Sequence, residues 1–318
     1  MIRAAGKERL HPRNRFRAGY DFGKLVRQSP ALAAFVKPNP HGDESVDYAD
    51  PRAVKALNQA LLEQAYGLQG WDLPPGYLCP PVPGRSDYLH YLADLLAGTK
   101  RDALPRGRSV AVLDIGVGAN CIYPLIGASE YGWRFVGSET DPVALAWAVS
   151  LVARNPGLAS LIEGRLQPSA TDCFRGVVRP GEFFDLSMCN PPFYASAAEA
   201  AAANLRKRRN LGSKTSRASL RNFGGRNAEL WCPGGELGFV QRMIAQSIEF
   251  AYQCRWFTTL VSKSVHLPRL REALRDADAA DLTTIDMAQG QKQSRILAWT
   301  FMGPDQGGPP AKASTRPG

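Results

Sequence analysis

From about residue 108 the chain alternates between short apolar runs and segments of helix length. The apolar runs that we expect to form strands lie at 110–115, 133–139, 161–166, 183–189 and 256–262. Continuous apolar runs of this length are typical of parallel strands that are covered by helices on both faces. The pattern therefore predicts an α/β fold with a doubly wound parallel sheet.

The end of this region breaks the alternation. A helix is expected at 267–277, and the apolar runs at 282–287 and 296–301 then follow one another without a helix-length segment between them. Strands joined in this way form an antiparallel hairpin, because a parallel pair needs a longer crossover. We therefore expect a terminal hairpin on the edge of a Rossmann-like sheet. This hairpin is absent from a plain dinucleotide-binding fold and present in class I methyltransferases.

The first part of the chain follows a different pattern. Residues 1–50 are basic, rich in Pro and Asn and poor in periodicity, which predicts an extended or partly helical arm. Asp50 and Pro51 then provide an N-cap and a first-turn proline for an amphipathic helix over 51–66. We expect this part of the chain to be an appendage to the sheet.

Proline-rich segments separate this helix from a second one. The segments at 74–76 and 80–84 are interpreted as ordered turns, and the second helix is expected to begin at Ser86. A polar stretch over 98–107 has the composition of a junction. We therefore divide the chain into an N-terminal region, a sheet domain and a tail, at 1–107, 108–302 and 303–318. The tail is rich in Gly, Pro and Ser and is expected to be disordered.

Basic residues are concentrated in two segments of a chain whose net charge is +10. Residues 1–27 carry +6 and residues 201–228 carry +8, so the remainder of the chain carries −4. Such segments on a mildly acidic body favour a polyanion as the partner, because each Lys or Arg near a phosphate releases counterions. Nucleic acid is therefore the leading class of partner, and the alternative is that both segments are solvated charge runs.

Other features limit the compartment and the chemistry. No stretch approaches the roughly 20 apolar residues that span a bilayer, and no apolar run follows the basic start, so we expect a soluble protein without a signal peptide or membrane contact. The six cysteines lack paired spacing, which fits reduced thiols in the cytosol. The four histidines are well separated, so we expect no metal site. No obligate protein partner is inferred.

A glycine-bearing turn follows the first strand of the predicted sheet. Asp114 lies near the end of that strand, and Gly116 and Gly118 come next, where the lack of a side chain lets the backbone approach a ligand closely. The helix that follows offers unpaired backbone amides. By itself such a turn is also compatible with a tight loop that binds nothing.

An acidic residue at the end of the next strand narrows the interpretation. Glu139 lies 23 residues after Gly116, where its carboxylate can reach the two hydroxyls of a cofactor ribose. The NAD fingerprint requires a third glycine where this chain has Cys121, so S-adenosylmethionine fits better. We prefer Glu139 to Asp141 for the ribose, because Asp141 and the following proline are typical of a helix cap.

The most specific motif is Asn190-Pro191-Pro192-Phe193, directly after the strand expected at 183–189. The Asn190 side-chain oxygen and the Pro191 carbonyl can accept hydrogen bonds from the two N–H groups of an exocyclic base amine, while Phe193 stacks on the base. Pro192 helps to hold these acceptors still. A base that enters this site must leave its stack, which favours a single-stranded or looped substrate. The motif therefore predicts the catalytic platform of a methyltransferase acting on an amine such as N6 of adenine.

Several alternatives remain open at this point. The same motif also serves guanine-N2 and protein glutamine methyltransferases, although the charge pattern favours nucleic acid over a protein substrate. A non-catalytic RNA-binding ribosome-assembly factor with a vestigial pocket is a second possibility. An NAD-dependent oxidoreductase is the third.

Motifs spread over nearly the whole chain together resemble one family. They are His11-Pro12-Arg13-Asn14-Arg15-Phe16, Asp50-Pro51-Arg52-Ala53-Val54, Pro83-Gly84-Arg85-Ser86-Asp87-Tyr88, Asp114-Ile115-Gly116-Val117-Gly118-Ala119-Asn120 and Cys189-Asn190-Pro191-Pro192-Phe193. The chain resembles the bacterial 23S ribosomal RNA adenine-N6 methyltransferases and their eukaryotic homologue, the methyltransferase-like protein that acts on U6 small nuclear RNA and messenger RNA hairpins. The resemblance implies S-adenosylmethionine-dependent methylation of one adenine in 23S ribosomal RNA or a large-subunit precursor in the cytoplasm; in that family it is adenine 1618.

The resemblance also implies roles for single residues around the cofactor. Arg85 would pair with the methionyl carboxylate, for which the fork of a guanidinium is suited. Thr171 or its neighbour Asp172 would lie near the adenine of the cofactor. The remaining cofactor-binding residues are expected to be Asp114, Gly116, Gly118, Glu139 and Asn190.

The RNA contacts implied by the resemblance fall on the two basic segments. They are expected at Arg13, Arg15, Arg17, Arg206, Lys207, Arg208 and Arg209. The eukaryotic homologue carries a C-terminal RNA-binding extension, whereas this chain ends soon after the predicted hairpin. That difference favours the bacterial ribosomal role.

Overall fold

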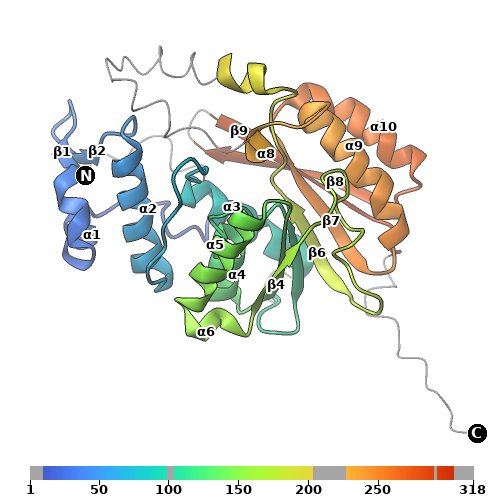
Figure 1. Cartoon of the computed structure of the whole chain (residues 1–318), viewed down its shortest axis with the longest axis horizontal. Coiled ribbons are helices and arrows are strands. Elements are labelled where there is room, and N and C mark those ends of the chain that lie inside the picture. The colour runs from blue at the N-terminus through green and yellow to red at the C-terminus, as the bar shows by residue number, and fades with distance from the viewer. Residues whose placement is uncertain (1–9, 99–103, 203–226, 290–291, 304–318) are drawn as a thin grey trace, which may run out of the picture.

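The computed structural model describes residues 10–98, 104–202, 227–289 and 292–303. A seven-stranded sheet with the order β5-β4-β3-β6-β7-β9-β8 lies at its centre (Figure 1). Along the chain the strands are β3 (Ala111–Ile115), β4 (Arg134–Glu139), β5 (Ile162–Leu166), β6 (Phe184–Cys189), β7 (Cys254–Val261), β8 (Asp281–Gln289) and β9 (Lys292–Thr300). The first five pair in parallel, and β9 is antiparallel to both β7 and β8. The predicted α/β class with a terminal antiparallel hairpin is confirmed.

The bounds of the parallel strands agree with the sequence prediction to within two residues at each end. The hairpin is longer than predicted, because β8 and β9 stay paired as far as Gln289 and Lys292. The apolar pattern marks only the part of a strand that is buried. Backbone pairing can continue beyond it, since the ladder bonds are made by N–H and C=O groups that every residue but proline carries.

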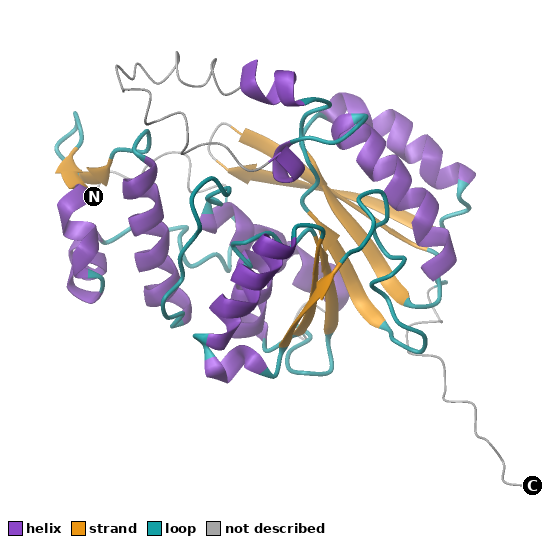
Figure 2. Cartoon of the chain, viewed as in Figure 1, coloured by secondary structure: helices purple, strands orange, loops and turns teal. Residues whose placement is uncertain are grey.

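Helices cover both faces of the sheet (Figure 2). One face carries α3 (Val82–Ala97), α4 (Ile122–Tyr131), α5 (Pro142–Ala153) and α6 (Pro156–Ala159), and the other carries α9 (Gly235–Ser247) and α10 (Leu267–Asp276). Successive residues of a strand serve opposite faces: Val112 is buried against the first group and Leu113 against the second. Further short helices described in the sheet domain include α8 (Asn227–Leu230), η3 (Ile248–Phe250) and η4 (Ser264–His266).

The N-terminal region forms a helical layer beside the sheet, at the left of Figure 1. Before α3, its elements are α1 (Phe22–Gln28), η1 (Pro30–Phe35), β1 (Val36–Pro38), β2 (Glu44–Val46) and α2 (Pro51–Tyr66), with β1 and β2 paired antiparallel. The helix α2 has the predicted bounds. Asp50 caps it by accepting a hydrogen bond from the backbone N–H of Arg52 at 2.9 Å, as the sequence predicted.

The start of α3 corrects a prediction. The helix begins at Val82 rather than at Ser86, so Val82, Pro83 and Gly84 form its first turn instead of an ordered loop. A proline fits there, because its fixed φ suits a helix and the missing N–H has no partner in the first turn. The correction matters for the site, because it places Arg85 on the helix, with its backbone N–H bonded to the carbonyl of Pro81 at 3.2 Å.

The N-terminal region and the sheet share buried contacts. Leu25 and Leu61 belong to the same buried cluster as Val112 and Leu186 of the sheet. The fully buried Tyr88 on α3 also shares a hydrogen bond of 2.7 Å with Thr258 of β7. The boundary at residue 107 stays a prediction, and the predicted tail from residue 304 onward lies outside the described residues. No helix in the described part of the chain is long and apolar enough to cross a membrane.

Candidate active site

The carboxyl ends of β3 and β6 lie side by side in the middle of the sheet. Ile115 of β3 pairs with Cys189 of β6 in the parallel register. The loops that begin at Gly116 and Asn190 therefore start next to each other, at the point where the strand order reverses. Open α/β sheets bind ligands at this position. The pairing of β3 with β6 thus brings together the two motifs that the sequence predicted separately.

The loop after β3 is a tight turn that depends on its glycines. Gly116 has φ of 75° and Gly118 has φ of 62°, both in the left-handed region that favours glycine. The backbone N–H groups of Gly116 and Val117 both donate to the carbonyl of Ser138 at 2.9 Å, which ties the turn to the end of β4. Cys121 also adopts a left-handed conformation just before α4 begins. The turn is therefore fixed by β4 on one side and by α4 on the other.

Glu139 lies at the end of β4, 8% exposed, and organises the backbone around it. Its Oε1 accepts hydrogen bonds from the backbone N–H groups of Thr140 and Asp141, at 2.8 and 3.1 Å. Its Oε2 accepts one from the N–H of Gly118 at 2.9 Å. A carboxylate oxygen can accept a second bond, so Oε2 retains capacity for a ribose hydroxyl. The ribose-binding role of Glu139 stays a prediction that this geometry accommodates.

Asp141 has the capping role that the sequence predicted. Its Oδ1 accepts a hydrogen bond from the backbone N–H of Val143 at 2.8 Å, at the start of α5. Its Oδ2 accepts a second one from the hydroxyl of Tyr77 at 2.7 Å. Both carboxylate oxygens are therefore engaged in holding local structure, in contrast to Glu139.

Asp114 and Arg85 supply charge beside the glycine turn. Asp114 is 1% exposed, and neither of its carboxylate oxygens has a hydrogen-bond partner among the described residues. Burial raises the pKa of Asp114 to about 8; the charge of Arg85 acts in the opposite direction and that of Glu139 adds to the increase. Arg85 donates to the hydroxyl of Tyr123 at 2.5 Å, but its buried Nε–H has no partner among the residues that the structure describes.

These unpartnered groups test whether the site fits S-adenosylmethionine. A buried carboxylate without a donor is unfavourable unless a ligand supplies one, and the same holds for a buried N–H without an acceptor. The methionyl part of the cofactor carries an ammonium group and a carboxylate, which match Asp114 and Arg85 in charge. The residues present therefore fit the cofactor, and the sequence signal for Arg85 was only the resemblance.

The loop after β6 is held by the last residue of α8 and by the segment that follows it. The backbone N–H groups of Phe193 and Tyr194 donate to the carbonyl of Leu230 at 3.1 and 3.0 Å. The N–H of Cys232 donates back to the carbonyl of Tyr194 at 3.1 Å. Within the motif itself, Pro191 is buried, whereas Asn190, Pro192 and Phe193 are partly exposed. The Asn190 loop is thus braced by backbone bonds and remains partly exposed.

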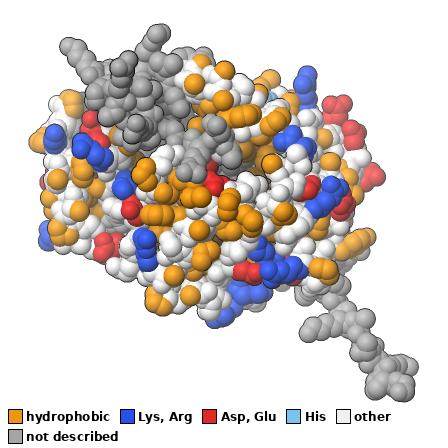
Figure 3. Space-filling model, in the orientation of Figure 1, with side chains coloured by type: hydrophobic (Ala, Val, Ile, Leu, Met, Phe, Trp, Pro, Cys, Tyr) orange, Lys and Arg blue, Asp and Glu red, His pale blue; other side chains and the backbone are white. Residues whose placement is uncertain are grey.

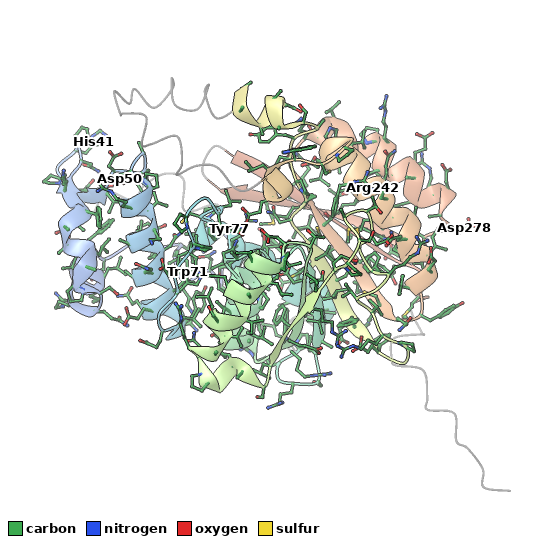
Figure 4. The ribbon with its side chains drawn as sticks, viewed as in Figure 1. His41, Asp50, Trp71, Tyr77, Arg242 and Asp278 are labelled. Atoms are coloured by element: carbon green, nitrogen blue, oxygen red, sulfur yellow. The ribbon has the colours of Figure 1, made fainter. Side chains whose placement is uncertain are left out.

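Sequence reasoning missed the connection between α2 and α3, which packs against the cofactor loops. The indole N–H of Trp71 donates to the carbonyl of Asn120 at 2.9 Å, and Tyr77 holds Asp141 as described above. Both side chains lie between α2 and the helices of the sheet domain (Figure 4). The signal available in the sequence was the presence of aromatic residues beside a proline-rich segment, which was interpreted only as a turn.

Thr171 and Asp172 lie in the segment that follows β5. The backbone N–H of Gln167 donates to the carbonyl of Glu139 at 2.8 Å, so this segment starts beside the cofactor loops. Asp172 accepts a hydrogen bond from Gln246 of α9 at 2.5 Å, whereas Thr171 is exposed and bonded to Ser169. Their contact with the cofactor adenine stays a prediction.

The predicted RNA-binding residues of the arm have different surroundings. Arg13 forms an ion pair with Asp94 at 2.8 Å and donates to the carbonyl of His90 at 2.7 Å, so much of its bonding capacity is used within the protein. Arg15 pairs with Glu130 at 2.8 Å and is half-exposed, and Arg17 is exposed. The predicted contacts at Arg206, Lys207, Arg208 and Arg209 lie outside the described residues.

The charge on the visible surface is mixed. Figure 3 shows basic and acidic side chains interspersed over both the N-terminal layer and the sheet domain. A cavity of about 530 Å³ opens at the amino ends of the strands, where Arg134, Glu182 and Asp185 are among its lining residues. Gly116 and Asn190 follow the carboxyl ends of the strands, so the cavity is separate from the candidate site. Within the described part of the chain, no group of three or more His, Cys, Asp or Glu side chains is arranged to hold a metal ion.

Comparison with known proteins gives consistent results over nearly the whole chain. Residues 4–303 match the model of a family described as RNA methyltransferase. The ribosomal RNA large subunit methyltransferase F of Serratia proteamaculans is 52% identical over 301 residues, which cover 94% of this chain and 90% of that protein. The protein of the same name from Pseudomonas aeruginosa is 54% identical over 295 residues, which cover 92% of this chain and 88% of the relative.

Solved structures of a more distant relative share the fold. The hMettl16 catalytic domain in complex with MAT2A 3'UTR hairpin 1 superimposes with a TM-score of 0.78 at 33% identity, covering 93% of this chain and 96% of that one. The N-terminal domain of human METTL16 in complex with SAH gives a TM-score of 0.72 at 30% identity, covering 92% and 99%. SAH is S-adenosylhomocysteine, which remains when S-adenosylmethionine has given up its methyl group.

Proposed function

The chain belongs to the RNA methyltransferase family that its residues 4–303 match, and from that premise we propose that it methylates the N6 amine of one adenine in 23S ribosomal RNA. It is an S-adenosylmethionine-dependent RNA methyltransferase. The relatives at 52% and 54% identity carry the name ribosomal RNA large subunit methyltransferase, which supports the same class of substrate here. The particular adenine, the resemblance suggests, is the one that the bacterial family modifies.

One observation carries the proposal. The pairing of Ile115 with Cys189 places the glycine turn and the Asn190 loop side by side at the carboxyl edge of the sheet. A methyl donor held by the turn and an amine held by the loop would then be neighbours. Such placement converts a reaction between two molecules into one within a single complex, which can contribute several orders of magnitude to the rate.

The proposed chemistry assigns separate tasks to the residues of the motif. The Asn190 side-chain oxygen and the Pro191 carbonyl accept hydrogen bonds from the two N–H groups of the adenine amine and so orient its lone pair. Phe193 stacks on the base. When bound, the cofactor supplies a methyl group on a positively charged sulfur. Because the sulfur is a good leaving group and the amine becomes more acidic as it is alkylated, no side chain with a tuned pKa is required as a base.

The cofactor would be held by residues of α3, of the ends of β3 and β4, and of the segment that follows β5. Asp114 would pair with its ammonium group, Arg85 with its methionyl carboxylate and Glu139 with its ribose hydroxyls. Gly116 and Gly118 would let the backbone approach it, and Thr171 or Asp172 would lie near its adenine. The assignments of Asp114 and Arg85 are supported by the burial of Asp114 and by the lack of a hydrogen-bond partner, among the described residues, for its carboxylate and for the Nε–H of Arg85.

The substrate would be 23S ribosomal RNA or a precursor of the large subunit, and the reaction would take place in the cytoplasm. RNA would be bound by the basic segments that contain Arg13, Arg15, Arg17 and residues 206–209, and the solved relative in complex with an RNA hairpin supports a looped substrate. Direct methylation of the base requires that the adenine leave its stack.

Analysis of the modified nucleoside tests the proposal. The purified protein is incubated with methyl-labelled S-adenosylmethionine and ribosomal RNA from a strain that lacks the enzyme, and the RNA is digested to nucleosides. We expect the label in N6-methyladenosine, at one position of 23S RNA. Label in a methylguanosine, or in methylglutamine of a ribosomal protein, would contradict the adenine assignment. Absence of any transfer would favour a non-catalytic RNA-binding factor.

A further inference from the structure

Glu229 lies at a junction of three parts of the site. It belongs to α8 and directly precedes Leu230, whose carbonyl accepts the backbone N–H groups of Phe193 and Tyr194. The residue is therefore attached by its main chain to the loop that is proposed to hold the target base. None of the sequence motifs includes it.

The side chain of Glu229 reaches the other two parts. Its Oε2 accepts a hydrogen bond from the backbone N–H of Leu78 at 3.1 Å, in the connection between α2 and α3. A Cβ atom added to Gly118 would lie 3.5 Å from Oε1 of Glu229, so the carboxylate lies beside the glycine turn. Leu78 and Glu229 are 151 residues apart in the sequence.

The carboxylate of Glu229 joins two others at the same turn. Glu139 accepts a hydrogen bond from the backbone N–H of Gly118 at 2.9 Å. Asp114 lies four residues earlier, and both of its oxygens are buried and without a hydrogen-bond partner in the described part of the chain. A carboxylate favours a cation in its neighbourhood, and the effect is stronger where water is excluded. S-adenosylmethionine carries one more positive charge than S-adenosylhomocysteine, because only the former has a sulfonium.

We propose that Glu229 is a specificity-determining residue that makes the pocket prefer the sulfonium cofactor to its neutral thioether product. Its charge favours the bound sulfonium, and the preference falls when methyl transfer removes that charge. Product release is thereby assisted by the reaction itself. The proposal rests on the binding of S-adenosylmethionine at the glycine turn and adds a residue to that site.

Calorimetric titration of the full chain tests it with three ligands. S-adenosylmethionine, S-adenosylhomocysteine and the analogue sinefungin, which carries an ammonium group in place of the sulfonium, are each titrated into wild type and into Glu229→Gln. The glutamine oxygen can still accept the N–H of Leu78, so the variant removes the charge and keeps the hydrogen bond. Glu272→Gln, on the exposed side of α10, is the matched control for loss of one carboxylate.

We expect Glu229→Gln to lower the affinities for S-adenosylmethionine and sinefungin by about tenfold relative to the affinity for S-adenosylhomocysteine. This is the size expected for one charge acting across a partly screened site. Glu272→Gln should leave all three affinities unchanged. Glu229→Ala also loses the hydrogen bond to Leu78 and should lower the affinities for all three ligands further, by a common factor.

Equal weakening of the three ligands in Glu229→Gln would overturn the proposal, because it would show a structural role alone. Unchanged affinities would overturn it as well. Failure of the wild type to bind either cofactor form would instead contradict the proposed function itself, so the two failures are distinguishable.

Discussion

Asp114 is a carboxyl group in surroundings that oppose its ionisation. It is 1% exposed, neither oxygen has a hydrogen-bond partner among the described residues, and burial raises its pKa from 3.8 to about 8. Near neutral pH the group is therefore mostly protonated when no ligand is bound. Because the folded form binds this proton more tightly than the unfolded chain does, the contribution of Asp114 to the free energy of unfolding falls as the pH rises from about 4 to about 8.

Cofactor binding should change the protonation of this residue. An ammonium group beside Asp114 favours the ionised form and lowers its pKa, so binding near neutral pH should release a proton. We therefore expect the affinity for S-adenosylhomocysteine to increase with pH up to about 8. Calorimetry in two buffers of different ionisation enthalpy measures the proton release.

The matched variant is Asp114→Asn, which is similar in size and does not titrate. We expect it to bind the cofactor more weakly and to lose the proton release that belongs to this group. If the variant released as many protons as the wild type, the proposed pairing of Asp114 with the ammonium group would be wrong.

The helix α4 owes its position in the fold to a glycine. Gly127 lies in the middle of α4, where a Cβ atom would be 2.3 Å from Cζ of Phe135 in β4 and 3.3 Å from Leu89 in α3. Because residue 127 has no Cβ atom, α4 can pack directly on the sheet and on α3. Since the glycine turn leads into α4, this close packing also fixes the cofactor loop.

Gly127→Ala should destabilise the protein. Overpacking of a core costs about 1–3 kcal/mol, and the better helix propensity of alanine returns only about 1 kcal/mol. We expect a net decrease of about 1 kcal/mol in the free energy of unfolding, measured by urea denaturation. Gly157→Ala, in the exposed helix α6 with no atom within 4 Å of the added Cβ, is the control and should be neutral or slightly stabilising. Equal stabilities of the two variants would contradict this account of α4.

The elements were predictable where a local pattern determines them. The apolar runs gave every strand of the main sheet, and Asp50 with Pro51 gave the start of α2. The start of α3 was not predictable in the same way, because Pro83 is compatible with both a turn and a first helical turn. Packing of α3 on the sheet, with Tyr88 bonded to Thr258, favours the helix, and that contact joins residues 170 positions apart.

The site was predictable as far as its motifs extend. The turn at Gly116 and the loop at Asn190 each follow a recognisable strand, but their proximity depends on the pairing of β3 with β6. Glu229 and Tyr77 could not be assigned from the sequence, because each reaches the site through a contact with a distant segment. Local periodicity contains no information about such contacts.

At the scale of the whole molecule, the N-terminal layer and the sheet support one site between them. Arg85 comes from α3, Tyr77 from the connection that precedes it, and Glu139 and Asn190 from strand ends of the sheet. One buried cluster runs through both parts. We therefore expect the N-terminal layer to be required for cofactor binding as well as for the predicted contacts with RNA.

The central claim is that the Asn190 loop presents the target amine to a methyl donor held at the glycine turn. Asn190→Ala in the full chain tests it most directly, with single-turnover methylation of 23S ribosomal RNA and titration of S-adenosylhomocysteine measured on the same preparation. We predict that the methylation rate falls by about a hundredfold or more, as for the loss of an oriented hydrogen-bonding group in other active sites. The cofactor affinity should fall far less than the rate, because the glycine turn, Arg85 and Glu139 are intact. A variant that methylates at the wild-type rate, or that loses cofactor binding in proportion to its activity, would contradict the claim.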